Sequence, residues 1–305
     1  MKKKSIYVEI PIRTSMDDLW KASQEPSVHE RWDLRFSSIT YLPKAQGSPQ
    51  RFTYKTRIGF GLDISGWGQS VTARKGGDGA RTSSLHFGTE QKRSIIREGR
   101  GFWKYVPRQD GGVTFLTRYD YTTNFGAAGR LFDRFCFRPL IGWATALSFD
   151  VLKRWLEKGT VPEVQYRNFF VTWLSAILFS FIWIYHGLVP KLIFQHPQEL
   201  AMLTSVLPIG EAVAHRVMSA IGIGEVVIGL LWLLCRRKRW LFAAQTAAFP
   251  LLTIGAVTAA PESLTQPFNP LTFNLALFAL SFLGFSFSKD VPTAKYCRRR
   301  QVTGE

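Results

Sequence analysis

The sequence has little cysteine, and its three cysteines stand far apart at Cys136, Cys235 and Cys297. There is therefore no Cys-x-x-Cys redox pair and no zinc-ligand spacing, so we expect buried or interfacial thiols and no metal site. Signatures of nucleic-acid binding are also missing, since neither a helix-turn-helix pattern nor an aromatic RNA-binding motif occurs. No glycine-rich loop leads from a strand into a helix to hold a phosphate, and no flavin fingerprint is present. We therefore expect no nucleic-acid partner and no bound cofactor.

Acidic residues are scarce, because 22 Asp and Glu face 39 Lys and Arg and leave a formal net charge of +17. A charge of this sign favours either nucleic acid or an anionic membrane surface as the partner. We favour the lipid bilayer, because the second half of the chain supplies an independent reason to be there. The chain opens with MKKKSIYVEI, which begins like a signal peptide but lacks the apolar segment that follows one, so we expect this end to be retained.

Long apolar runs dominate the second half of the chain. They cover residues 169–190, 217–235, 240–260 and 271–288. A bilayer core about 30 Å thick needs roughly 20 apolar residues per helix, so each run is long enough to cross it. Too little polar sequence remains around these runs to cover them as buried helices of a soluble core. We therefore predict four transmembrane helices.

Basic residues gather at particular connections between these runs. Segment 236–239 is entirely basic, and residues 289–300 carry five Lys and Arg, whereas segment 261–270 carries none. Short cytoplasmic loops of membrane proteins are enriched in Lys and Arg. We therefore predict a multi-pass protein of the inner (plasma) membrane, with both termini and the polar first half in the cytoplasm.

The first half alternates in the manner of strands and ends in one long helical pattern. Residues 6–14 read as a strand, and Ser15 is a candidate N-cap for the short helix that follows it, before a second short helix. Six β-rich stretches come next, at about 38–43, 51–58, 62–74, 81–90, 94–106 and 113–123, followed by a helix over about 129–158 that is interrupted near Pro139. An antiparallel sheet must bury one face, and the long helix is the element that can cover it.

This order of elements resembles that of a known superfamily. The segments SMDDLWKASQEPSVHERWDLRFSSITYL and RLFDRFCFRPLIGWATALSFDVLKRWLEKG resemble the START-like, polyketide-cyclase-related (SRPBCC) domains. That resemblance covers about residues 4–160 and implies an α+β helix-grip fold, in which an antiparallel sheet wraps a long C-terminal helix.

The membrane half also resembles a family. The segments WIYHGLVPKL, GIGEVVIGLLWLL and FNPLTFNLAL resemble the DoxX-like family of small four-span bacterial membrane proteins. We therefore expect a START-like domain over 1–160, a linker over 161–168, an all-α four-helix transmembrane bundle over 169–290 and a basic cytoplasmic tail over 291–305.

The START-like resemblance implies an apolar cavity between the sheet and the long helix. Aromatic side chains of this half are candidates to line it and to bind a lipid, a sterol-like or an aromatic ligand. Ordinary core packing is the competing explanation for each of them. The candidates are Trp32, Trp67, Phe87, Trp103, Tyr119 and Tyr121.

Glu225 is the one charged residue in an apolar run that ends at the basic segment 236–239. A carboxylate inside a bilayer is costly and usually faces other helices and finds a partner there. It belongs either to a proton-accepting or polar-ligand site, or to a hydrogen bond that fixes helix packing. We expect an intramembrane polar site from Glu225, His186, His215, Gln245 and Asn274.

Two functions follow from these resemblances. The first is a membrane-anchored binding protein, in which the cytoplasmic START-like domain holds a hydrophobic ligand, such as a lipid, a quinone or an aromatic compound, beside the DoxX-like bundle. The alternative is a membrane subunit of a quinone-linked oxidoreductase or of a thiol or sulfur redox system, because some DoxX-like relatives are linked to such chemistry. The alternative implies quinone and a membrane redox partner, and either function allows a homo-oligomer. The sequence assigns no catalytic residue and leaves open whether the protein is an enzyme.

Overall fold

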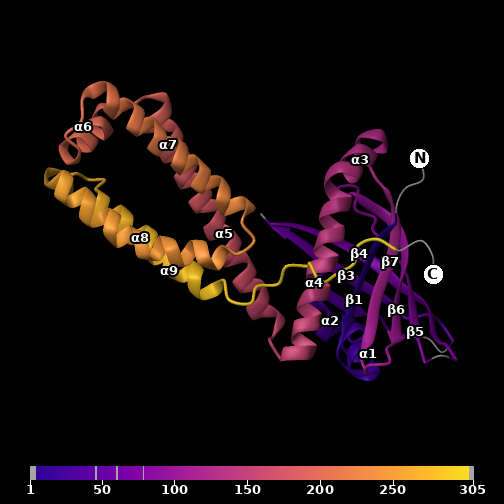
Figure 1. Ribbon diagram of the computed structural model, residues 1–305. Helices are drawn as coiled ribbons and strands as arrows, with labels where there is room; N and C mark the ends of the chain where they lie inside the picture. Colours follow the sequence, from indigo (N-terminus) through magenta and orange to yellow (C-terminus); the bar gives the residue numbers. More distant parts are fainter. Residues whose placement is uncertain (1–4, 45–46, 60, 78, 302–305) are drawn as a thin grey trace. The chain divides into compact units, whose positions relative to one another are not determined.

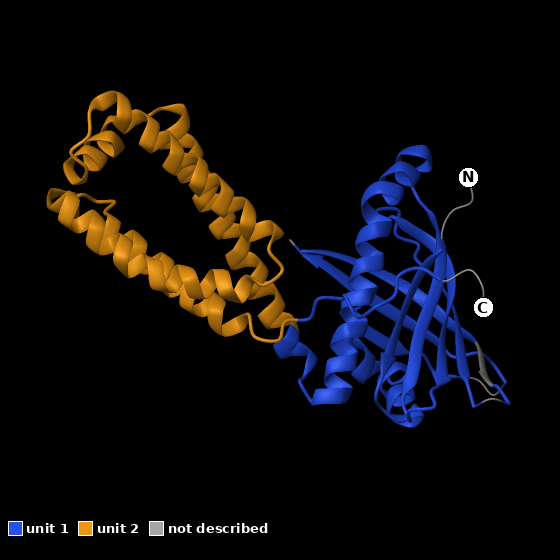
Figure 2. Ribbon diagram, in the orientation of Figure 1, with its two compact units in different colours: residues 1–165, 292–305 blue, residues 166–291 orange. Residues whose placement is uncertain are grey.

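The computed structural model describes residues 5–44, 47–59, 61–77 and 79–301 (Figure 1). The chain divides into two compact units, shown in different colours in Figure 2. Unit 1 comprises residues 1–165 together with 292–305, and unit 2 comprises residues 166–291.

Unit 1 is built on a seven-stranded antiparallel sheet in the order β1-β7-β6-β5-β4-β3-β2. Along β1 the residues at every second position are buried, which gives the sheet one apolar face. The expected strands are all present. Their bounds are β1 Ile6–Ile12, β2 Ser38–Tyr41, β3 Arg51–Gly59, β4 Leu62–Lys75, β5 Arg81–Gly88, β6 Ile96–Pro107 and β7 Val113–Thr123.

The helices of unit 1 lie between β1 and β2 and after β7. The first two are α1 Met16–Gln24, whose N-cap Ser15 accepts a hydrogen bond from the amide of Asp18 at 3.0 Å, and α2 Pro26–Trp32. After β7 come α3 Gly126–Phe132, the π-helical turn η1 Asp133–Phe137 and α4 Arg138–Lys158. The expected interruption near Pro139 is this π-helical turn.

Helix α4 covers the apolar face of the sheet (Figure 1). Its residues from Thr145 to Leu152 are buried, and Phe149 stacks on Phe115 of β7 with ring centroids 4.4 Å apart. Gly159 ends the helix in a left-handed conformation at φ 70°, which glycine adopts without steric cost. The expected helix-grip fold class is therefore confirmed for the first half of the chain.

Residues 292–301, which belong to the segment that we expected to form a basic cytoplasmic tail over 291–305, pack against unit 1. The amides of Thr293 and Ala294 donate to Asp150 of α4 at 2.8 and 3.2 Å. Glu9 and Arg298 exchange backbone hydrogen bonds of 2.9 and 2.8 Å at the free edge of β1. The tail thus covers part of an otherwise unpaired strand edge.

Unit 2 consists of helices. Its helices are α5 Pro162–His186, which begins in unit 1 and continues as the π-helical η2 Gly187–Ile193, then α6 Pro197–Val206, α7 Glu211–Leu234, α8 Lys238–Ala259, the 3-10 turn η3 Pro261–Thr265 and α9 Pro270–Phe287. The sequence predicted α5, α7, α8 and α9 but not α6. An aromatic cluster packs α5, α7 and α8 together. The ring of Phe179 stacks on Trp232 with centroids 5.1 Å apart, and the ring of Phe242 lies 4.7 Å from the same tryptophan.

Among the described residues, five helical segments are long and apolar enough to cross a membrane. In the segment Gly126–Lys158, 44% of the most apolar 18-residue stretch is buried, because α4 covers the sheet of unit 1. The other four are α5 with η2, α7, α8 and α9. Only 17% to 33% of the most apolar stretch of each is buried inside the protein. Helices that keep apolar side chains on the outside are typical of a lipid environment. The second half therefore has apolar helices of the kind that the sequence predicted.

Lys238, in the basic segment between α7 and α8, caps the C-terminal end of α7. Lys238 donates to the carbonyl oxygens of Trp232 at 2.6 Å and Cys235 at 3.2 Å, and its ammonium lies 4.1 Å from the centre of the Trp173 ring. A cation there satisfies carbonyls at the end of α7 that have no partner within the helix.

Candidate functional site: a cavity in unit 1 and an ion pair in unit 2

Unit 1 contains a cavity of about 400 Å³ between the apolar face of the sheet and the first turns of α4. Most of its wall is aliphatic or aromatic, and the side chains come from α1, α2 and the residues that follow it, the sheet, η1 and α4. A largely apolar wall with a few polar groups is typical of sites for small hydrophobic ligands. Representative wall residues are Phe36, Ile39, Phe52, Leu85, Leu140 and Ile141.

Glycines on the inner face of the sheet make room for this cavity. A methyl group at Gly66 would overlap the ring of Tyr54, and one at Gly68 would overlap the ring of Phe52. A methyl group at Gly99 would overlap the ring of Phe87. The aromatic rings therefore lie flat over bare backbone instead of standing into the interior, which is a recognised use of glycine within a strand.

Three of the six aromatic residues that we expected to line the cavity do so. Phe87, Trp103 and Tyr119 are on its wall. Trp32 is fully buried beside the wall, where its indole donates to the carbonyl of Ala22 at 2.8 Å, so it packs the core.

Trp67 and Tyr121 are also absent from the cavity wall formed by the described residues. Trp67 lies on the opposite face of β4 from Ile64, where its ring meets His86 edge-on with centroids 5.0 Å apart. The alternation of side chains along a strand separates these two faces. Tyr121 donates to Asp133 at 2.6 Å, so its hydroxyl fixes η1 against β7.

A buried ion pair forms one polar part of the wall. The guanidinium of Arg35 donates to Asp33 at 2.8 and 2.6 Å, and the ring nitrogen of His29 lies 3.0 Å from the same carboxylate. Burial alone would raise the pKa of Asp33, but the charge of Arg35 and hydrogen bonds from Arg35 and His29 hold that pKa well below its usual range. Both groups are therefore charged, and the net charge of the pair is close to zero. It was not among the residues that we predicted.

Hydroxyl and amide groups form a second polar part. The hydroxyls of Ser23 and Tyr105 lie 2.7 Å apart, and the amide of Gln24 donates to Tyr105 at 2.9 Å. Ser83 donates to the side-chain oxygen of Gln24 at 3.3 Å, and Ser23, Gln24 and Ser83 all reach the cavity wall. Such groups can hydrogen-bond to the polar end of an otherwise apolar molecule.

Metal-ligand clusters of three or more His, Cys, Asp or Glu side chains do not occur within the described ranges. The three cysteines are free thiols. Cys297 is largely buried, which raises the pKa of its thiol to about 12, and this thiol lies 3.2 Å from the carbonyl oxygen of Ala146.

In unit 2, Glu225 of α7 pairs with Lys191 of η2 at 3.1 Å. The same ammonium lies 3.3 Å from Glu199 of α6, so one lysine joins two carboxylates. The backbones of η2 and α7 approach closely here: a methyl group at Gly187 or Gly222 would collide with the backbone of the other helix. Glycines at such positions let membrane helices approach each other closely.

Three of the other expected members of the intramembrane site, His186, His215 and Gln245, contact side chains outside the predicted set. His186 stacks on Phe273 with centroids 5.6 Å apart and lies within electrostatic range of Lys191 and Glu199. His215 lies 2.9 Å from the side-chain oxygen of Gln195. Gln245 accepts from Trp183 at 3.1 Å and donates to Ser281 at 3.2 Å, and Asn274 is half-buried on α9. The described structure therefore does not bring the five predicted residues into one site, and our reasoning missed Lys191.

A relative shares most of the length of this chain. The uncharacterised membrane protein YndG of Bacillus subtilis (strain 168) is 40% identical over 241 residues, which are 79% of this chain and 81% of YndG. The chain belongs to the YndG family. Residues 180–282 also match the DoxX-like family, so the second half carries the expected DoxX-like domain.

Solved structures resemble the first half at low identity. A protein from Thermobifida fusca is 16% identical and covers 50% of this chain and 95% of its own, with a TM-score of 0.36. The di-domain ARO/CYC StfQ from the steffimycin biosynthetic pathway is 16% identical, covers 50% of this chain and 52% of its own, and has a TM-score of 0.35. Norcoclaurine synthase from Thalictrum flavum is 15% identical, covers 49% and 87%, and has a TM-score of 0.34. The fold assigned above depends on the strand order and on α4, not on these scores.

Proposed function

We propose that this protein is a membrane-anchored binding protein whose unit 1 holds a hydrophobic ligand such as a lipid, a quinone or an aromatic compound. The observation that carries the proposal is the cavity of about 400 Å³, which has a mainly apolar wall and a hydrogen-bonding group at Gln24. Ligand sites commonly measure roughly 300–1,000 Å³ and combine an apolar wall with a few orienting polar groups. An amphiphile with one polar end fits this chemistry.

The proposal includes a membrane topology. The four apolar helices of unit 2 cross the inner membrane, and unit 1 and both termini are cytoplasmic. The basic segment 236–239 and the basic residues after α9 support this orientation. A second argument is geometric: the chain leaves unit 1 at residue 165 and returns to it at residue 292. A chain that leaves and rejoins the same domain has crossed the membrane an even number of times.

The test is to identify what copurifies with the full-length protein by native mass spectrometry. Leu85→Trp fills the cavity, whereas Ser84→Trp places the same ring on the opposite face of β5. We expect an apolar species with the wild type and Ser84→Trp. Leu85→Trp should retain at least about fivefold less of this species, because forcing a larger side chain into the space costs about 1 kcal/mol or more.

Equal retention in both variants would contradict the proposal, and so would a folded protein that carries no apolar species. An absorption spectrum of the same sample tests the competing hypothesis of a quinone-linked redox subunit, because bound haem or flavin absorbs visible light. Strong visible absorbance would favour that alternative.

A further inference from the structure

A segment at one end of unit 1 exposes apolar side chains that the core does not use. Residues Thr145–Leu152 of α4 are buried against the sheet, but residues 125–136, which precede α4, are mostly exposed. Phe135 is 66% exposed, Leu131 62% and Leu140 58%. Apolar residues exposed singly are ordinary, but a contiguous group marks an interaction surface.

This group reaches the cavity wall at Leu140. Ile58 of β3 and Leu140 of α4 both line the cavity, and both are more than half exposed. We call the exposed apolar residues here the mouth surface. Its members are Ile58, Leu62, Phe125, Leu131, Phe132, Phe135 and Leu140.

The charge around the mouth surface is positive. Arg130 and Arg134 are exposed on α3 and η1, between the apolar residues, and Arg57 is exposed beside Ile58. The acidic residue of the segment 125–140 is Asp133, which is buried and paired with Arg138 at 3.0 Å. Apolar side chains interleaved with exposed arginines match the two layers of an anionic lipid leaflet, acyl chains below and phosphates above.

We propose that the mouth surface docks on the anionic cytoplasmic leaflet, so that the cavity opens to the acyl chains. The apolar rings and Leu131 enter the interface, and Arg130 and Arg134 meet lipid phosphates. The helices of unit 2 tether unit 1 to the same membrane, and a tether makes weak docking sufficient because the local concentration of the surface is high. The inference depends on the membrane attachment of the chain and not on what the cavity holds.

Cys136 provides a probe at this place, because it is exposed within η1. In the full-length protein, Cys235→Ser and Cys297→Ser leave Cys136 as the labelling site for a small fluorophore. The protein is placed in nanodiscs of phosphatidylcholine with phosphatidylglycerol, or of phosphatidylcholine alone. A nitroxide on the lipid acyl chain then reports contact by quenching the fluorophore.

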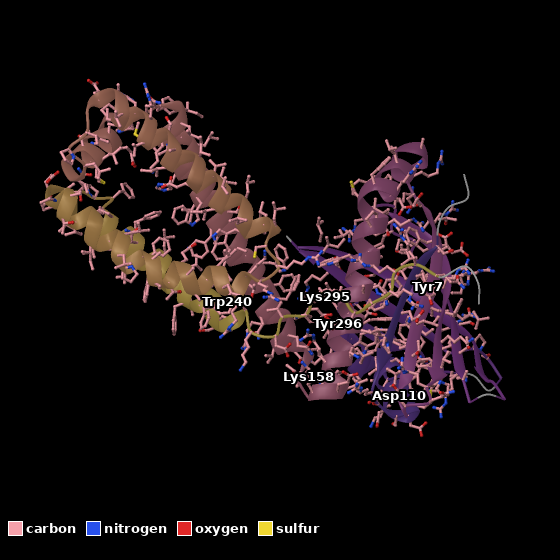
Figure 3. The ribbon with its side chains drawn as sticks, viewed as in Figure 1. Tyr7, Asp110, Lys158, Trp240, Lys295 and Tyr296 are labelled. Carbon is pink, nitrogen blue, oxygen red and sulfur yellow. The ribbon has the colours of Figure 1, made fainter. Side chains whose placement is uncertain are left out.

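The reference position is Asp110, in the turn between β6 and β7. Figures 1 and 3 show this turn at the end of unit 1 opposite to α3. The label is moved there by Asp110→Cys combined with Cys136→Ser in the same background.

We expect quenching at position 136 that is stronger in the anionic nanodiscs than in phosphatidylcholine alone, and none at position 110. Arg130→Glu with Arg134→Glu should abolish the extra quenching in anionic nanodiscs, and Leu131→Ser should weaken it in both. Equal quenching at the two positions, or none at position 136, would overturn the docking surface. Either result leaves the copurification test unaffected, since that test reads the content of the cavity and not the depth of the label.

Discussion

Removal of the Asp33 carboxylate should destabilise unit 1 strongly. This side chain is fully buried and accepts hydrogen bonds from the backbone amide of Arg35 at 3.1 Å, from the Arg35 guanidinium and from His29. In Asp33→Ala the guanidinium of Arg35, whose side chain is only 14% exposed, keeps its charge and loses its counter-ion. Breaking a buried pair on one side costs about 3–5 kcal/mol, because it leaves an uncompensated charge.

The size of the effect follows from the urea dependence of unfolding. With a slope of about 2 kcal/mol per molar urea, a loss of about 3–5 kcal/mol lowers the urea midpoint by about 1.5–2.5 M. Pulse proteolysis of the full-length protein in detergent micelles measures this midpoint for unit 1, because the protease digests molecules in which that unit is unfolded. The matched control is Asp63→Ala, which removes exposed pairs with Arg93 at 3.6 Å and Lys55 at 4.0 Å and should leave the midpoint unchanged.

A second variant separates the ion pair from general damage to the core. Asp33→Ala combined with Arg35→Met removes both charges and keeps an apolar chain against the wall. This double variant should recover most of the lost midpoint, because a buried ion pair exchanged for apolar groups is often close to neutral. An Asp33→Ala midpoint equal to that of the wild type would refute the reasoning, and a double variant as unstable as the single one would show that the charge is not the cause.

Three further outcomes are expected. Folding lowers the pKa of Asp33, so its carboxylate contributes its full stabilisation of the folded state above about pH 4 and loses it as the pH falls. The urea midpoints of wild type and Asp33→Ala should therefore converge in acid. Glu225→Leu should lower the yield of folded protein, because it removes a carboxylate beside the buried Lys191. Glu225→Gln keeps a hydrogen-bond acceptor and should be tolerated. Size-exclusion profiles in detergent measure both outcomes. Asp150→Ala removes the acceptor of the tail amides, and trypsin should then cleave after Lys295 faster than in the wild type.

The fold of unit 1 was predictable, because each strand and the closing helix carry a local pattern. The alternation in β1 and the N-cap at Ser15 are properties of neighbouring residues, and the structure has both. The return of the tail is different. Its attachment joins Asp150 to Thr293 through a hydrogen bond across 143 positions of the chain, and no local pattern in either segment indicates it.

The cavity was predictable in kind but not residue by residue. Period-two alternation divides the aromatic residues between two faces of the sheet, and the sequence does not state which face is inside. The glycines supply that information, since Gly66 and Gly68 flank Trp67 and face the rings of Tyr54 and Phe52. Bare backbone opposite aromatic rings marks the inner face, so Trp67 between them must point outward. This signal was present in SGWGQS and was not used.

The carboxylate in the apolar helix α7 has a partner that the sequence concealed. Pro190 indicates the end of a helix, and Lys191 therefore reads as a loop residue. The structure instead continues α5 through Pro190 as the π-helical η2, which carries Lys191 back against α7 at the level of Gly222 and Glu225. Glu225 is thus level with the final turns of the first apolar helix and not isolated among lipid tails. A lysine that joins Glu225 to Glu199 also links η2, α7 and α6, so a change in its charge would act on three elements at once.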